Sequence, residues 1–135
     1  MQRRYEDMKA LLSDRRKLAV EKARGIFSTP EDAPIFVFGN QKSGTSAIAG
    51  LLGAACGVRV QNDFRGAWEP RMTPLVRGKT DISGFVSANR WPFSAKIIKE
   101  PCLTFRADDL MQHFRVERAV FVIRDPLANI RSILG

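Results

Sequence analysis

The chain has 135 residues, which is enough for one domain with an ordinary hydrophobic core. Hydrophobic residues make up 44% of it, which excludes a wholly disordered protein. Its apolar runs are far shorter than the roughly 18 residues of a membrane-spanning helix, and its charged N-terminus lacks the apolar core of a secretory signal. Cys56 and Cys102 lack the spacing of zinc ligands, so we expect free thiols in a cytoplasmic protein.

The formal net charge is +8, so the chain attracts anions such as phosphorylated ligands, acidic lipids or nucleic acid. Residues 1–25 carry eight Lys or Arg against four acidic residues, which is half of the excess. Apolar residues at helical spacing predict a basic amphipathic helix over residues 1–26, followed by a turn-rich connector. Aromatic residues are not interleaved with the basic ones, so we interpret the helix as a solvated face. A nucleic-acid-binding module remains an alternative.

A strand, a tight loop and a helix follow in direct succession. The apolar run at 35–38 predicts a buried parallel strand, and the helix formers at 47–55 predict a helix that Gly57 ends. Between them, Gly44 lets the backbone turn tightly and approach a ligand closely. Unpaired N–H groups and the helix dipole make such a helix N-terminus an anion site. The sequence therefore predicts a phosphate-binding loop.

The rest of the chain continues the alternation of strands and helices. Segments 58–64 and 95–99 predict strands, and 118–123 predicts another buried one. A helix is expected over 106–115, with Leu110, Met111 and Phe114 facing inward, and a further helix from about residue 127. Short helices within a long loop are expected before residue 95. This order predicts an α/β fold, in which an open, mainly parallel sheet lies between two layers of helices.

The spacing of the loop tests which phosphate it binds. The nucleoside-triphosphate loop reads G-x-x-x-x-G-K-[ST], and Gly39, Gly44 and Ser46 fit three of its positions. Thr45 stands where the lysine belongs, and Lys42 comes before the second glycine instead. The displaced ammonium would reach the ligand from another part of the loop, which weakens the ATP-binding interpretation. A P-loop kinase or NTPase, with Asp125 holding Mg²⁺, remains an alternative.

The segment Q-K-S-G-T-S at 41–46 resembles the 5'-phosphosulfate loop of the sulfotransferase family. That family transfers a sulfuryl group from 3'-phosphoadenylyl sulfate (PAPS), and its fold is of the P-loop type. The resemblance implies that Lys42 contacts the bridging region and stabilises the leaving group. It also implies that the 5'-phosphate is held by the loop and by the start of the helix, namely Ser43, Gly44, Thr45 and Ser46.

A second motif resembles the 3'-phosphate signature of the same family, an arginine at a strand end with a serine eight residues later. Arg124 and Ser132 match that spacing. A guanidinium is suited to forked recognition of a phosphate, and the carboxyl edge of a sheet is where open α/β folds bind ligands. The resemblance covers residues 34–135 and implies the N-terminal portion of a sulfotransferase domain, with a sheet that is incomplete at its C-terminus.

The reaction that the resemblance implies is transfer of the sulfuryl group from PAPS to an acceptor hydroxyl or amine, without a metal and without nucleic acid. An acceptor hydroxyl needs a general base. Glu69, in a Trp-Glu-Pro turn, and Glu100, at a strand end, are the candidates, and Lys99 is a candidate for holding the sulfonate. The single histidine, His113, is expected to be structural or exposed.

Overall fold

The computed structural model of the chain describes residues 2–64 and 73–134, and within its first helix the side chains of residue 13 and of residues 15 onward. The helix α1 (Gln2–Ile26) comes first, as expected. The remaining elements are β1 (Ile35–Gly39), α2 (Thr45–Cys56), β2 (Val60–Asn62), α3 (Thr73–Val76), α4 (Ile82–Ala88), α5 (Arg90–Phe93), β3 (Ile97–Lys99), the 3-10 helix η2 (Pro101–Arg106), α6 (Ala107–Phe114), β4 (Val120–Val122) and α7 (Pro126–Leu134). None of the helices in the described part of the chain is both long and apolar enough to cross a membrane.

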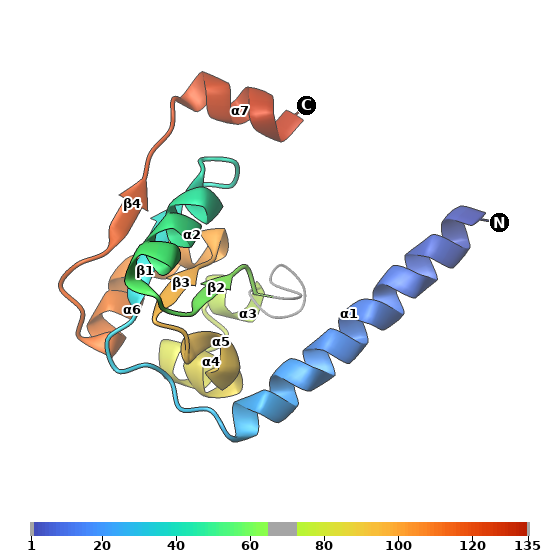
Figure 1. The fold of residues 1–135 in the computed structure, drawn as a ribbon, viewed down its shortest axis with the longest axis horizontal. Coiled ribbons are helices and arrows are strands. Elements are labelled where there is room, and N and C mark those ends of the chain that lie inside the picture. The colour runs from blue at the N-terminus through green and yellow to red at the C-terminus, as the bar shows by residue number, and fades with distance from the viewer. Residues whose placement is uncertain (1, 65–72, 135) are drawn as a thin grey trace.

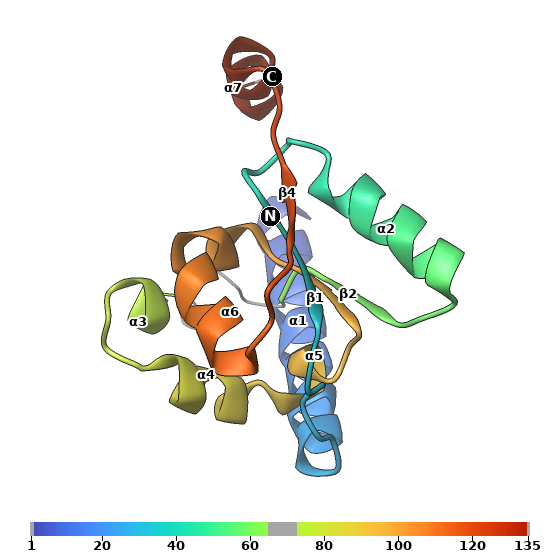
Figure 2. The same ribbon diagram turned by 90° about the vertical axis from the view of Figure 1, so that its left-hand side faces the viewer.

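The four strands form one parallel sheet in the order β2-β3-β1-β4, which confirms the predicted α/β class. Side chains alternate along β1, so its two faces bury different neighbours. Phe36 and Phe38 join the larger core, to which α3, α4, α5, η2 and α6 also contribute. Val37 faces the other way and packs with Ala49 of α2. Figure 2 shows α2 on one side of the sheet and α3, α4 and α6 on the other.

The order of the strands fixes where a ligand can bind. From β1 the chain passes through α2 to β2, two places away, and β3 then fills the position between them. From β3 the chain crosses to β4 on the opposite side of β1. The connections after β1 and β3 therefore leave in opposite directions, and the crevice at the carboxyl ends of such strands is the usual ligand site of open α/β sheets.

A strand was correctly predicted within residues 118–123, but the prediction that it is buried was wrong. The strand exists as β4, but it pairs with β1 alone at the edge of the sheet. Phe121 is 56% exposed and Ile123 is 90% exposed. An apolar run is typical of a strand that is covered on both faces, but it does not distinguish a central strand from an edge strand. The other predicted strands and helices are present: β1 and α2 are slightly longer than expected, and β2, β3 and α6 are shorter. On α6, Leu110 and Phe114 are buried as expected, and Met111 is partly buried.

Candidate functional site

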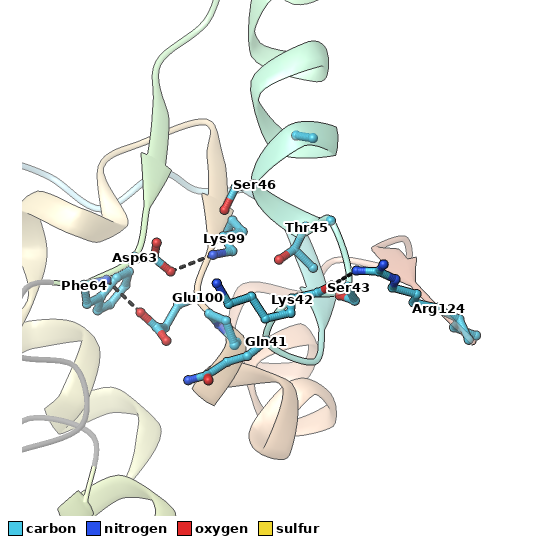
Figure 3. A pocket seen from close by; sticks show the side chains of 14 residues that line it. Gln41, Lys42, Ser43, Thr45, Ser46, Asp63, Phe64, Lys99, Glu100 and Arg124 are labelled. Carbon is cyan, nitrogen blue, oxygen red and sulfur yellow. Dashed lines mark hydrogen bonds and ion pairs between the residues drawn. The ribbon is translucent and has the colours of Figure 1, made fainter. Parts of the chain in front are cut away.

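A cavity of about 1160 Å³ lies at the carboxyl ends of all four strands. Each strand contributes residues at its carboxyl end or just after it, so segments far apart in sequence meet there (Figure 3). Its lining comprises Gln41 to Ala47, Asp63, Phe64, Lys99, Glu100, Pro101, Ile123 and Arg124. The sheet topology and the cavity therefore point independently to the same place.

The loop between β1 and α2 presents main-chain donors to this cavity. Gly44 precedes α2 with φ of 98°, a conformation that glycine adopts without strain, and no side chain caps the helix. Within the described part of the chain, the N–H groups of Thr45 and Ser46 have no hydrogen-bond acceptor. Free N–H groups at the first turn of a twelve-residue helix attract an anion, and the helix dipole adds to this.

Two side chains from the end of the chain hold the outer side of this loop. Nη1 of Arg124 donates to the carbonyl oxygen of Lys42 at 2.7 Å. Nδ2 of Asn129, on α7, donates to the carbonyl oxygen of Gln41 at 2.8 Å. Figure 3 shows Arg124 on the far side of the loop from the Lys42 ammonium, which extends into the cavity. These two hydrogen bonds therefore hold the loop on its outer side, and the Lys42 ammonium faces the cavity.

Lys99 and Asp63 form an ion pair inside the cavity. The Lys99 side chain is 6% exposed, and its Nζ lies 2.6 Å from Oδ1 of Asp63, whose side chain is 60% exposed. Parallel pairing of β2 with β3 sets Asn62 opposite Lys99, and the N–H of Asp63 donates to the Lys99 carbonyl oxygen. Lys42 and Arg124, in contrast, have no carboxylate partner among the described residues. Two unpaired cations suit a ligand with more than one negative charge.

Glu100 lies in the cavity wall, but its carboxylate is already occupied. The residue is 3% exposed, Oε2 accepts from the N–H of Phe64 at 2.7 Å, and Oε1 accepts from the N–H of Cys102 at 3.1 Å. Burial, followed by the nearby Glu100 carboxylate, raises the pKa of the Cys102 thiol to about 12. Glu100 therefore joins the end of β2 to the start of η2, which is a structural role.

The structure brings most of the predicted site residues together. Lys42, Ser43, Gly44, Thr45, Ser46, Glu100 and Arg124 all line the cavity. Ser132 lies on α7 and does not line it, and Glu69 lies outside the described residues. Asp125 directly precedes α7, its Oδ1 accepts from the N–H of Ala128, and it does not line the cavity either. His113 is exposed on α6, as expected.

Sequence reasoning missed two residues of this site. Asp63 has a weak signal, because it directly follows a predicted strand, whereas nothing in the sequence marks Asn129. Among residues 2–64 and 73–134, as far as their side chains are described, no group of three or more His, Cys, Asp or Glu side chains could hold a metal ion. Comparison of the chain with protein-family models, with curated proteins and with solved structures gave no match.

Proposed function

We propose that this chain binds PAPS and transfers its sulfuryl group to an acceptor hydroxyl or amine. The observation that carries the proposal is the single cavity that joins Lys42, the first turn of α2 and Arg124 at the carboxyl edge of a parallel sheet. The strand, glycine loop and helix at its centre also support a fold of the P-loop type. The early position of Lys42 favours a phosphosulfate over a nucleoside triphosphate.

The charges of the cavity match the two ends of the donor. The 5'-phosphate lies against the N–H groups of Thr45 and Ser46, and the Lys42 ammonium neutralises the oxygen that leaves from sulfur. The 3'-phosphate lies near the Arg124 guanidinium, which offers forked donors. Small-molecule sites occupy about 300–1,000 Å³, so the cavity has room for a nucleotide together with the reacting group of an acceptor.

Asp63 is the carboxylate best placed to take the proton of the acceptor. Its side chain is 60% exposed and lines the cavity, whereas both oxygens of Glu100 are bonded to main-chain N–H groups. The acceptor oxygen attacks sulfur in line, and its bond to sulfur forms as the bond from sulfur to the bridging phosphate oxygen breaks. The proton passes to Asp63, and adenosine 3',5'-bisphosphate leaves. Lys99 holds the Asp63 carboxylate in position.

Calorimetric titration with adenosine 3',5'-bisphosphate tests the donor site. In EDTA we expect the bisphosphate to bind more tightly than ADP or ATP, because only it carries the 3'-phosphate. Lys42→Ala should weaken this binding by about ten-fold or more, the worth of a charge-assisted contact. Lys79→Ala removes an exposed lysine outside the cavity and should leave binding unchanged. Binding of ATP alone, and only with magnesium, would favour a kinase instead.

The role of Asp63 is tested with water as the acceptor. Asp63→Asn should slow the release of bisphosphate from PAPS by about 10² or more, the usual contribution of a general base, with bisphosphate affinity retained. Glu100→Gln should instead lower the free energy of unfolding by about 1–3 kcal/mol, because an amide nitrogen replaces an acceptor of a buried N–H. If the properly folded Glu100→Gln variant loses the reaction and Asp63→Asn keeps it, the two roles are reversed.

A further inference from the structure

A second cleft, of about 630 Å³, lies between α1 and the end of β2. Figure 1 shows α1 beside α5 at its C-terminal end and diverging from the other elements toward its N-terminus. Arg16, Lys17 and Arg24 line the cleft from α1. Asp63 and Phe64 line both this cleft and the large cavity, so the two spaces meet at these residues.

The cleft has an excess of unpaired positive charge. Arg16, Lys17 and Arg24 have no carboxylate partner among the side chains that the structure describes. The two acids of the lining do not neutralise them, because Asp63 is held by Lys99, and Glu21 is buried and has an interaction of its own. A concave surface with three unpaired cations raises the local concentration of anions.

Two guanidinium groups share one aromatic ring at the edge of this cleft. Arg24 lies 5.1 Å and Arg59 lies 4.3 Å from the centre of the Trp91 ring. Arg59 is fixed there, since its Nη2 donates to the Trp91 carbonyl oxygen and to Oγ of Ser94, each at 2.8 Å. Burial, and after it the charge of Arg24, lowers the pKa of Arg59. An anion bound in the cleft would offset the repulsion between these two cations.

We infer that this cleft binds the acceptor, and that the acceptor carries a carboxylate, sulfate or phosphate group beside its reactive hydroxyl or amine. The inference rests on the proposed function, and it adds the location and the charge of the second substrate. The anionic group lies against Arg16 and Lys17, and the reactive oxygen or nitrogen reaches Asp63, where the cleft opens into the donor cavity. The helix α1, outside the donor site, thereby selects the substrate.

Glucuronate and glucose make a matched pair of probes, because they differ only by a carboxylate in place of a CH₂OH group. The reporter is the indole N–H signal of Trp91 in the NMR spectrum, identified by its loss in Trp91→Phe. With adenosine 3',5'-bisphosphate already bound, we expect glucuronate to shift this signal and glucose to leave it unchanged. Arg16→Gln/Lys17→Gln should weaken the glucuronate effect by about ten-fold, and Arg77→Gln, which lies outside the cleft, should not.

The outcomes separate this inference from the proposed function. If the bisphosphate binds but glucuronate and glucose act alike, the inference is wrong and the donor site stands. If glucuronate and the bisphosphate displace each other, the cleft belongs to the donor and the inference is again wrong. A larger, steeply salt-dependent shift with a short oligothymidylate would make the cleft a nucleic-acid surface and would also overturn it. If the bisphosphate itself does not bind, the proposed function fails and the inference falls with it.

Discussion

The guanidinium of Arg124 donates a hydrogen bond of 2.7 Å to the main-chain oxygen of Lys42, 82 residues earlier in the chain. The bond ties the end of β4 to the loop after β1, so Arg124 supports the loop as well as lining the cavity. We expect Arg124→Ala to weaken bisphosphate binding by about ten-fold or more in calorimetric titration, because a charged donor is lost. Arg118→Ala removes an exposed arginine outside the cavity and is the matched control.

Titration of the Arg124→Ala variant with 5'-AMP separates the two roles of this side chain. Contact with the 3'-phosphate predicts a larger loss of affinity for the bisphosphate than for 5'-AMP, which lacks that group. Equal losses for the two nucleotides would mean that Arg124 acts only by holding the loop, and the assignment of the 3'-phosphate to it would be wrong.

Lys42 adopts a left-handed conformation, with φ of 61°, which costs an ordinary residue about 1–2 kcal/mol. Lys42→Gly should therefore raise the free energy of unfolding by up to about 1 kcal/mol in urea denaturation, after the greater freedom of glycine in the unfolded chain is subtracted. Lys42→Ala keeps the strain and should gain nothing. Both variants should lose bisphosphate affinity equally. A stable Lys42→Gly variant that still binds tightly would remove the lysine from the donor site.

Gly39, at the end of β1, has no room for a side chain. A Cβ there would lie 2.6 Å from the carbonyl oxygen of Val122 on β4, and its φ is 149°. Gly39→Ala should lower the free energy of unfolding by about 2 kcal/mol or more. Gly50→Ala is the contrasting variant, since its Cβ would meet nothing within 4 Å on the exposed face of α2, and it should stabilise by about 0.5–1 kcal/mol. Similar losses for both would contradict the close approach of β4 to β1.

The buried Cys102 thiol makes stability depend on pH in alkaline solution. Its pKa rises from 9.0 to about 12 on folding, so between these values the unfolded chain has lost a proton that the folded chain keeps. The thiol therefore favours unfolding as pH rises above 9, by about 1.4 kcal/mol per pH unit. Urea denaturation of the parent should show this additional decline, and Cys102→Ala should lack it. Parallel pH profiles for the two proteins would contradict the raised pKa.

The parts of the site that could be predicted from the sequence are those formed by neighbouring residues. An apolar strand, a glycine turn and a helix start lie within residues 35–46, so the loop with Lys42 follows from local patterns alone. Asp63 meets Lys99 only because β2 pairs with β3 in one register, and no local pattern states that register. Glu100 lies at the end of a strand, as expected, but the main-chain donors that occupy its oxygens belong to Phe64 and Cys102, and no local pattern predicts them.

Ser132 shows that a local pattern also fails to predict which residue of a helix reaches the site. Its spacing from Arg124 matches a motif, but the depth of a residue in a site depends on how the whole helix is placed. Asn129, about one turn earlier on α7, is the residue that reaches the loop, and Ser132 lies beyond the cavity. The exposure of β4 could not be predicted either, because apolar residues such as Phe121 and Ile123 occur in central strands and in edge strands alike. Only the place of β4 at the edge of the sheet decides its burial.

The attachment of α7 has a consequence for dynamics. The helix has nine residues, of which Asn129 alone is buried, and helices this short are marginal in water on their own. Two hydrogen bonds help to attach it to the rest of the protein. Asn129 donates to the Gln41 carbonyl oxygen, and Arg124, just before the helix, donates to the Lys42 carbonyl oxygen. Whatever immobilises the loop therefore also slows local opening of α7 (Figure 1). Immobilisation of the loop after β1, for example by a bound ligand, should therefore slow amide hydrogen exchange in α7. The exchange rates of this helix would report the state of a loop more than 80 residues earlier in the chain.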